Sequence, residues 1–241
     1  MPALADFDAL SFDCYGTLID WETGIAAALA PWAQAHDLVV GPDDLVAAFS
    51  ANETHVQQEH PTSRYPDVLA ETMRRVGDRL GAAVSDDEAA TFGASVGQWP
   101  AFPDSADALH RLHTRYRLII LSNVDRASFA RSAARLGVDF DLVITAEDVG
   151  AYKPSPRSFE ALLAGVDDLG IPRERLLHVA ESLYHDHVPA QANRLHSVWI
   201  DRRRDDASTA SPPPDRLVRP DWTFTSMGDF AAAAVPGDDP S

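Results

Sequence analysis

Residues Phe12-Asp13-Cys14-Tyr15-Gly16-Thr17-Leu18 decide how this chain folds. They close an apolar run, Ala9-Leu10-Ser11-Phe12, which predicts a buried strand over residues 8–13, and the strand then breaks at Gly16. In an open α/β sheet, ligands bind beyond the carboxyl ends of the strands. Asp13 is therefore expected at a functional edge, where it would serve as a nucleophile, a metal ligand or a ribose ligand.

The composition limits the class of protein and its partners. The chain has 241 residues and is 45% hydrophobic, which suffices for one large domain or for a core with an inserted second domain. Its formal net charge of −17 argues against nucleic acid or an anionic membrane as a partner, although a small anionic substrate needs only local positive charge. No run of apolar residues reaches membrane-spanning length. The single cysteine, Cys14, excludes an intramolecular disulfide and favours a cytoplasmic location.

The pattern divides the chain into a helical block and an alternating block. Helices are expected at about 22–36, 43–59, 66–80 and 86–97, and again at 104–114, 126–136, 156–165 and 186–194. Further strands are expected at about 116–121, 141–144, 175–179, 196–200 and 222–224. Alternating strands and helices predict an α/β fold with a doubly wound, parallel, Rossmann-like sheet. Residues 1–19 and 100–241 would form this core domain, and residues 20–99 an inserted α-helical cap domain.

Polar side chains follow several of the expected strands. Asp13, Ser122-Asn123 and Glu181 come at strand ends, and Lys153 lies in the loop after a strand. Because parallel strands end at one edge of the sheet, these residues are expected to converge. The set suggests nucleophilic displacement by Asp13, with Lys153 holding the carboxylate ionised and stabilising charge that develops on the substrate.

The remaining polar residues suggest supporting roles. Thr17 and Ser122 are expected to hydrogen-bond the nucleophile or an anionic group of the substrate. Asp186 or His185 would orient or deprotonate the water that hydrolyses the covalent intermediate.

Four segments of the chain, in order, resemble the motifs of the haloacid dehalogenase superfamily. They are the stretch from Asp13 to Leu18, Ser122-Asn123, Lys153-Pro154 and the segment from His178 to Asp186. The resemblance covers nearly the whole chain. It implies that Asp13 is the nucleophile and that residues 20–99 form a mobile cap over the site. A homodimer through cap helices is common in similar proteins.

The residue two positions after the nucleophile separates two branches of this superfamily. Its phosphatases carry a second Asp there, which protonates the leaving alkoxide, whereas this chain has Tyr15. Halide leaves without a proton, so Tyr15 favours carbon–halogen cleavage. The pattern Asp13-x-Tyr15-Gly16-Thr17 with Ser122-Asn123 resembles the 2-haloacid dehalogenase (type II) branch. That branch implies hydrolytic dehalogenation of a small 2-haloalkanoic acid to the 2-hydroxy acid, with no metal or other cofactor. Tyr15 and Asn123 are the expected substrate contacts of the core.

Two alternatives remain open from the sequence. The first is a Mg²⁺-dependent phosphatase for a small phosphorylated metabolite, with Asp13, Glu181 and Asp186 around the ion. The second is a catalytic fold retained only for binding or scaffolding. The cap also departs from well-studied L-2-haloacid dehalogenases, which carry an Arg early in the cap, because the first basic residue here is Arg64. Arg64, with His55 and Gln58 as further possibilities, is therefore the candidate from the cap for binding the substrate anion.

Overall fold

A six-stranded sheet forms the centre of the molecule. The computed structural model describes residues 2–202, 214 and 217–237. The strands lie in the order β3-β2-β1-β4-β5-β6, and every neighbouring pair is parallel. Their bounds are β1 Ala9–Phe12, β2 Arg117–Ser122, β3 Leu142–Thr145, β4 Leu176–Ala180, β5 His196–Ile200 and β6 Trp222–Phe224. The predicted doubly wound parallel sheet is confirmed, and β1 lies at the point where the strand order reverses.

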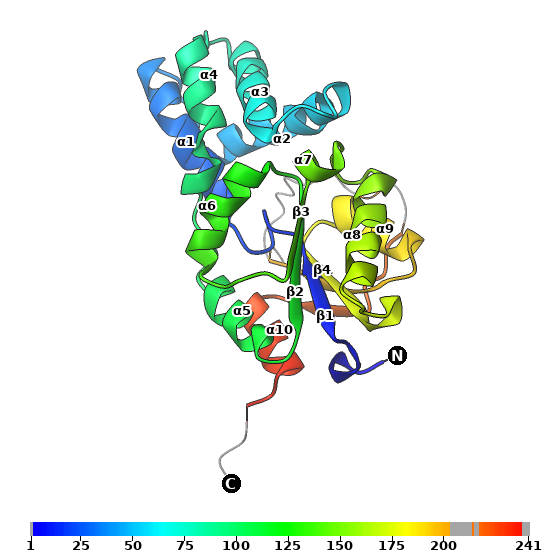
Figure 1. Cartoon of the computed structure of the whole chain (residues 1–241). Coiled ribbons are helices and arrows are strands. Elements are labelled where there is room, and N and C mark those ends of the chain that lie inside the picture. Colours follow the sequence, from blue (N-terminus) through cyan, green and yellow to red (C-terminus); the bar gives the residue numbers. More distant parts are fainter. Residues whose placement is uncertain (1, 203–213, 215–216, 238–241) are drawn as a thin grey trace.

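Helices cover both faces of this sheet (Figure 1). One face carries α5 (Ser105–His113), α6 (Arg126–Leu136) and α10 (Met227–Ala234), and the other carries α8 (Pro156–Asp168) and α9 (Val188–Ala192). Side chains along a strand alternate between the two layers, as the pleat requires. Leu10 and Phe12 of β1 pack in one apolar cluster, whereas Ala9 packs in the other. Both faces of the sheet are covered by helices and buried. This explains why the sequences of β1, β2 and β4 are nearly continuous apolar runs.

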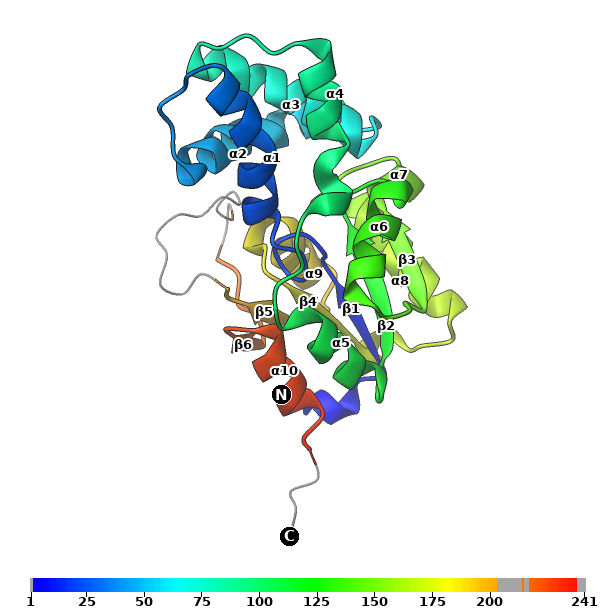
Figure 2. The same ribbon diagram turned by 90° about the vertical axis from the view of Figure 1, so that its left-hand side faces the viewer.

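A helical cap lies over the carboxyl ends of the strands (Figures 1 and 2). It consists of α1 (Trp21–Ala35), α2 (Pro42–Glu59), α3 (Tyr65–Leu80) and α4 (Asp86–Gly93), which pack on one another in sequence order. Its helices begin at polar caps, since Asp20 accepts from the backbone of Thr23, and Ser85 forms a capping box with Glu88. The exact division of the chain into two domains stays a prediction.

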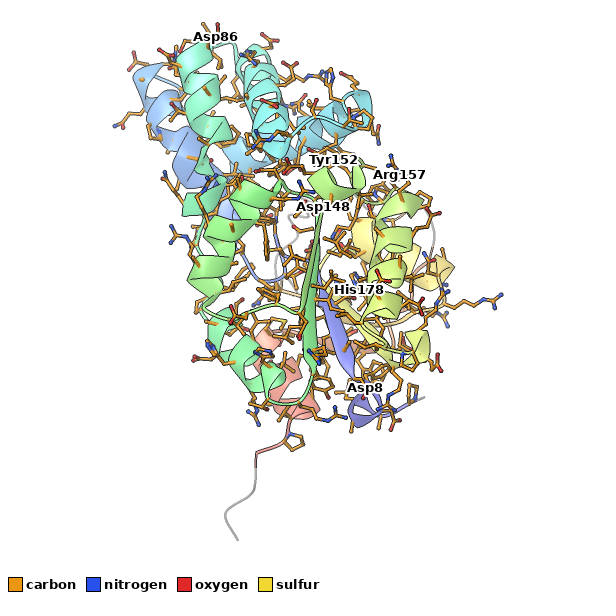
Figure 3. The ribbon with its side chains drawn as sticks, viewed as in Figure 1. Asp8, Asp86, Asp148, Tyr152, Arg157 and His178 are labelled. Atoms are coloured by element: carbon orange, nitrogen blue, oxygen red, sulfur yellow. The ribbon has the colours of Figure 1, made fainter. Side chains whose placement is uncertain are left out.

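The cap touches the core near the loop that carries Lys153. The hydroxyl of Tyr152 donates a hydrogen bond to the carbonyl of Ser63, at 2.8 Å, and Figure 3 shows Tyr152 at the boundary between cap and core. The ring of Tyr152 also lies beside that of Tyr65, with centroids 6.4 Å apart. Residues of the cap are therefore held close to the strand ends that carry the candidate site.

Local differences from the predicted elements have simple causes. The fourth cap helix ends at Gly93, a poor helix former, and continues as a 3₁₀ turn over Ser95–Gln98. The predicted helix at 186–194 is a π-helical turn, Leu183–His187, followed by α9. A short helix, α7 (Ala146–Val149), was not predicted, and 3₁₀ turns lie at Leu4–Asp6 and Arg173–Arg175. The charged, then proline-rich segment 202–220 also predicts a surface loop, but most of this segment and residues 238–241 lie outside the described residues.

No helix within the described ranges combines the length and the apolar character needed to cross a membrane.

Candidate active site

Asp13 lies directly after β1 and is held on both carboxylate oxygens. Gly16 has a φ of +98°, a conformation that favours glycine, and it turns the chain so that Thr17 comes back toward Asp13. The Thr17 hydroxyl then donates to Oδ2 of Asp13 at 2.8 Å. The ammonium of Lys153 donates to Oδ1, also at 2.8 Å. The turn after β1 thus fixes the orientation of the Asp13 carboxylate.

Lys153 joins two carboxylates and one strand end. Besides Asp13, its Nζ donates to Oδ1 of Asp186 at 2.7 Å and to the carbonyl of Leu121 at 3.0 Å, and the side chain is 2% exposed. The side chain of Asn123 holds the backbone of Lys153 from both ends. Its amide nitrogen donates to the Lys153 carbonyl at 3.1 Å, and its oxygen accepts from the Lys153 N–H at 2.6 Å. Asn123 therefore positions the lysine.

Asp186 is fully buried behind the lysine. Its Oδ1 also contacts Nε2 of His178 at 3.0 Å, and Nδ1 of His178 contacts the Ser11 hydroxyl at 2.9 Å. Figure 3 shows His178 beside the sheet, below the cap. Phe159 packs on the His178 ring with centroids 5.2 Å apart and seals this layer from solvent. Asp186 therefore contacts Lys153 from the buried side, away from the cavity.

One cation, Lys153, is paired with two carboxylates, Asp13 and Asp186, and this pairing governs their protonation. Burial raises the pKa of Asp13, and Lys153 only partly offsets this effect. Burial acts in the same direction on Asp186, but Lys153 and His178 outweigh it and hold the pKa of that carboxyl well below its usual range. Burial lowers the pKa of Lys153, but Asp13 and Asp186 together raise it. The lysine is charged, and Asp13 is the carboxylate that protonates first as the pH falls.

A cavity of about 70 Å³ opens above Asp13, between the core and the cap. Five of the residues proposed from the sequence line it, namely Asp13, Tyr15, Asn123, Lys153 and His185. The other lining residues are Trp21, Ser50, Glu53, Thr54, Gln57 and Tyr65 from the cap, and Ser182 from the core. The cavity is small, and the cap supplies half of its walls.

Tyr15 lines the cavity, but its hydroxyl is engaged elsewhere. Its oxygen lies 2.9 Å from the hydroxyl of Ser132, and its ring packs edge-on against Trp99 with centroids 5.7 Å apart. Burial raises the pKa of Tyr15 well above its ordinary value of 10. Tyr15 is therefore a poor proton donor for a leaving group at neutral pH.

Three other candidates lie away from the cavity lining. Ser122 is buried, and its hydroxyl has no hydrogen-bond partner within the described part of the chain. Asp186 does not line the cavity and is linked to it through its hydrogen bond with Lys153. Arg64 lies at the start of α3, with 57% of its side chain exposed, and faces Asp125 and Glu147 at 3.7 and 3.9 Å. Arg64 faces Asp125 and Glu147 and does not line this cavity, so its role as a ligand of the substrate anion stays a prediction.

His185, which the sequence suggested as an alternative to Asp186, does line the cavity. Its Nδ1 lies 3.1 Å from the Ser182 hydroxyl, and its Nε2 is buried without a partner among residues 2–202, 214 and 217–237. Burial lowers the pKa of His185 to about 4. The imidazole is therefore neutral at pH 7, with one ring nitrogen available to a molecule in the cavity.

The acidic set that the phosphatase alternative needs is not gathered around one point. The backbone N–H of Glu181 donates to the Thr17 hydroxyl at 2.9 Å, and its carbonyl accepts from Trp199 at 2.8 Å. Across the described ranges, no three His, Cys, Asp or Glu side chains are grouped so that they could hold a metal ion. Asp13, Glu181 and Asp186 are therefore not grouped as three side-chain ligands, and the Mg²⁺-dependent alternative stays a prediction.

Comparison with known proteins identifies the family of the chain. Residues 7–184 match the family model of the haloacid dehalogenase-like hydrolases. The chain belongs to this hydrolase family. Its relatives include the (S)-2-haloacid dehalogenase of Pseudomonas putida, 22% identical over 227 residues that cover 90% of this chain and 94% of the relative. Phosphoglycolate phosphatase of Salmonella paratyphi A is 29% identical over 206 residues, which cover 76% of this chain and 77% of the relative.

The fold of this hydrolase is shared with solved dehalogenase structures. One is the L-2-haloacid dehalogenase from Xanthobacter autotrophicus with chloropropionic acid covalently bound. It superposes with a TM-score of 0.77 at 19% identity, over 93% of this chain and 97% of the other. The resemblance noted from the motifs is confirmed at the level of family and fold, and the substrate is left open.

Sequence reasoning missed all six residues that the cap contributes to the cavity of the hydrolase. Glu53, Gln57 and Tyr65 lie on α2 and α3, which show the usual amphipathic pattern of a helix. Nothing in this pattern distinguishes these three residues from their neighbours. A helical pattern tells which side chains share a face, but not which face covers the strand ends. The Glu53 carboxyl, unlike Asp13, follows no strand and no turn motif that would have marked it.

Proposed function

We propose that this hydrolase cleaves the carbon–halogen bond of a small 2-halo carboxylic acid through an ester on Asp13. The observation that carries this proposal is Tyr15. An alkoxide leaving group needs a proton, and the Tyr15 hydroxyl, bonded to Ser132, is poorly suited to supply one. Halide leaves with its bonding electrons and needs no proton, so the chemistry fits the groups present.

In the first step, an oxygen of Asp13 attacks C2 of the substrate. The new C–O bond forms as the C–halogen bond breaks, and the halide departs. Thr17 and Lys153 would hold the attacking carboxylate in one orientation, which their 2.8 Å hydrogen bonds support. The backbone N–H groups of Cys14 and Tyr15 donate to no acceptor among the described residues, so they are available to bind the carboxylate of the substrate.

In the second step, water attacks the carbonyl carbon of the Asp13 ester. A base accepts a proton from the attacking water, the bond between that carbon and the ester oxygen attached to C2 breaks, and the protonated base returns the proton to this oxygen as the 2-hydroxy acid leaves. We assign the base role to His185, because its neutral imidazole lines the cavity with Nε2 unpaired within the described ranges. Asp186 would then act through Lys153, which balances the charge on the ester oxygen.

Heavy-oxygen water in a single turnover tests this route. The proposal expects the label in the Asp13 carboxylate, detected by mass spectrometry of the peptide that contains it. The product of that first turnover should carry no label, because its new oxygen comes from Asp13. Label found in the product but absent from Asp13 would rule out the ester.

Phosphate monoester hydrolysis is the second candidate, and the 29% identity to a phosphoglycolate phosphatase favours it. The two activities are distinguished by measuring halide and phosphate release side by side over panels of small substrates, with and without Mg²⁺. Phosphate release that a chelator abolishes and Mg²⁺ restores would replace the first proposal. Halide release that is indifferent to the chelator supports it.

A further inference from the structure

The cap side of the cavity contains one ionisable carboxyl and several aromatic rings. Glu53 projects from α2, and Trp21 and Tyr65 line the same cavity from α1 and α3. Gln57, one helical turn after Glu53, completes this side. None of these residues belongs to the network of Asp13, Lys153 and Asp186.

The Glu53 carboxyl is held in place by neutral donors. The Tyr65 hydroxyl donates to Oε1 at 2.7 Å, and the amide nitrogen of Gln57 donates to the same oxygen at 3.1 Å. Within the described part of the chain, Oε2 takes no hydrogen bond from the protein, and no Lys, Arg or His forms an ion pair with Glu53. Burial raises the pKa of Glu53 to about 7. The carboxyl therefore lacks a cation to balance its charge.

No cation is available to pair with Glu53 among the described residues that line the cavity. Lys153 is the one permanent cation that lines the cavity among the described residues, and it is bonded to Asp13 and Asp186. His185 also lines the cavity but is neutral, and Tyr15 and Tyr152, the other titratable groups near Glu53, are protonated. A positive group brought by a ligand would be the first partner available to the Glu53 carboxylate.

We propose that Glu53, with the rings of Trp21 and Tyr65, binds an ammonium group at the end of the substrate farthest from the reacting carbon. A carboxylate beside aromatic side chains suits an alkylammonium, because the ammonium donates a charge-assisted hydrogen bond to the carboxylate and the alkyl chain packs on the rings. The same wall disfavours a second carboxylate or a phosphate there, because no cation would balance either group. This inference rests on the proposed dehalogenase function and narrows its substrate class to 2-halo acids that carry a distal amine.

Binding of simple probes tests the ammonium site without any turnover. Calorimetry would compare n-butylammonium with 1-butanol, which has the same length and no charge, on the wild type. We expect the amine to bind roughly 10- to 100-fold more tightly, the range for a hydrogen bond to a charged group. In Glu53→Gln this preference should disappear. Glu59→Gln is the matched control, since Glu59 lies on the same helix, pairs with Arg75 and lies outside the cavity.

The outcomes of that experiment are decisive in either direction. Equal binding of the two probes, no measurable binding of n-butylammonium, or a preference that survives in Glu53→Gln would overturn the ammonium site. Glu53→Asp keeps the charge and should keep part of the preference, which guards against a Glu53→Gln variant that folds poorly. Circular dichroism of each variant checks the fold.

Turnover then separates this inference from the proposed function. Halide release would be compared between 2-chloro acids that end in an amine and 2-chloro acids of equal length that end in a methyl group. We expect a roughly 10- to 100-fold higher kcat/KM for the amine, lost in Glu53→Gln and kept in Glu59→Gln. Halide release from both series at equal rates would leave the dehalogenase standing and overturn the ammonium site. No halide release from either series, together with intact n-butylammonium binding, would overturn the dehalogenase instead.

Discussion

The two sides of the cavity hold carboxyl groups whose charge is balanced in different ways. On the core side, which we call the floor, Asp13 and Asp186 share the Lys153 ammonium at 2.8 and 2.7 Å. On the cap side, the roof, Glu53 accepts hydrogen bonds from Tyr65 and Gln57 and has no cation within the described ranges. The floor contains its own counter-charge, whereas the roof needs one from a ligand.

This difference separates the chemistry from the selection of substrate. The shared ammonium holds both carboxylates of the floor in fixed positions, which a nucleophile requires on every turnover. The Glu53 carboxyl is partly buried and has no cation beside it, so its pKa is raised. It should bind most tightly to a ligand that carries a positive charge. In this chain the floor would therefore carry out the chemistry, and the roof would select the substrate. The four predictions below test this contrast, from the largest expected effect to the smallest.

Removing the cation of the floor should have the largest effect. Lys153→Met leaves Asp13 and Asp186 buried without their shared partner, so we expect the free energy of unfolding to fall by about 3–5 kcal/mol. Halide release should fall to background. Urea denaturation measures the first effect. The control Arg117→Gln removes a cation from a surface pair with Asp141 and should cost less than about 1 kcal/mol.

Lys153 is the only lysine in the sequence, which allows a direct observation. Isotope-labelled lysine gives one side-chain ammonium signal by NMR. That signal should persist to high pH in the wild type, since Asp13 and Asp186 raise the pKa of Lys153. An unfolding loss for Lys153→Met no greater than for Arg117→Gln would contradict the description of the floor.

Replacing the base of the floor should slow only one of the two steps. In His185→Gln we expect a halide burst of normal rate and a hydrolysis step slower by about 10²- to 10⁴-fold. The pKa of His185 is lowered to about 4, so its base form is present above that pH and the wild-type hydrolysis step should weaken only as pH falls through about 4. Rapid-quench kinetics resolves the two steps. His55→Gln, an exposed change on the cap, is the control, and equal slowing of both steps would exclude His185 as the base.

Glu53→Gln should change how stability depends on pH. The pKa of Glu53 is about 7 when folded against a reference value of 4.5, so the folded protein holds this proton more tightly than the unfolded chain does. The carboxyl therefore costs no stability below about pH 4.5, an increasing amount up to pH 7 and a constant amount above it. Relative to wild type, Glu53→Gln should gain about 2 kcal/mol between pH 4.5 and 8, after allowance for partial exposure.

The same measurement on Glu59→Gln provides the contrast for the roof. Glu59 pairs with Arg75, which lowers its pKa, so this variant should show no gain as pH rises. Urea denaturation at four or five pH values is enough to separate the two curves. A Glu53→Gln curve parallel to that of the wild type would mean that the carboxyl already has a counter-charge, and the contrast between floor and roof would fail.

The floor was largely predictable from sequence, and the reason is topological. Asp13, Asn123 and Lys153 each follow a strand pattern, and parallel strands end at one edge, so their convergence required no knowledge of packing. The cavity position of His185, rather than Asp186, was not predictable. It depends on a π-helical turn at Leu183–His187, where a simple helix was expected.

The roof was not predictable, because no backbone rule ties a cap helix to the strand ends. The helices themselves were correctly expected from their periodicity and caps, but the choice of Glu53 over Arg64 as a cavity residue depends on how α2 and α3 are rotated over the core. That rotation follows from packing contacts such as the one between Tyr152 and Ser63, which join residues far apart in sequence. Arg64 was proposed because it is positively charged. The charge of a residue does not determine whether its side chain points into the cavity.

The smallest effect is expected for Arg64, the cation that the sequence suggested for the roof. Its side chain is 57% exposed, and its contacts to Asp125 and Glu147 are long, at 3.7 and 3.9 Å. We expect Arg64→Gln to change the KM for a 2-halo acid by less than about twofold and the free energy of unfolding by less than about 1 kcal/mol. Glu53→Gln, measured in the same assay, should change the KM for an amine-bearing substrate far more. A tenfold rise in KM for Arg64→Gln would mean that the cap turns Arg64 into the cavity when substrate binds, and the roof would then supply a cation of its own.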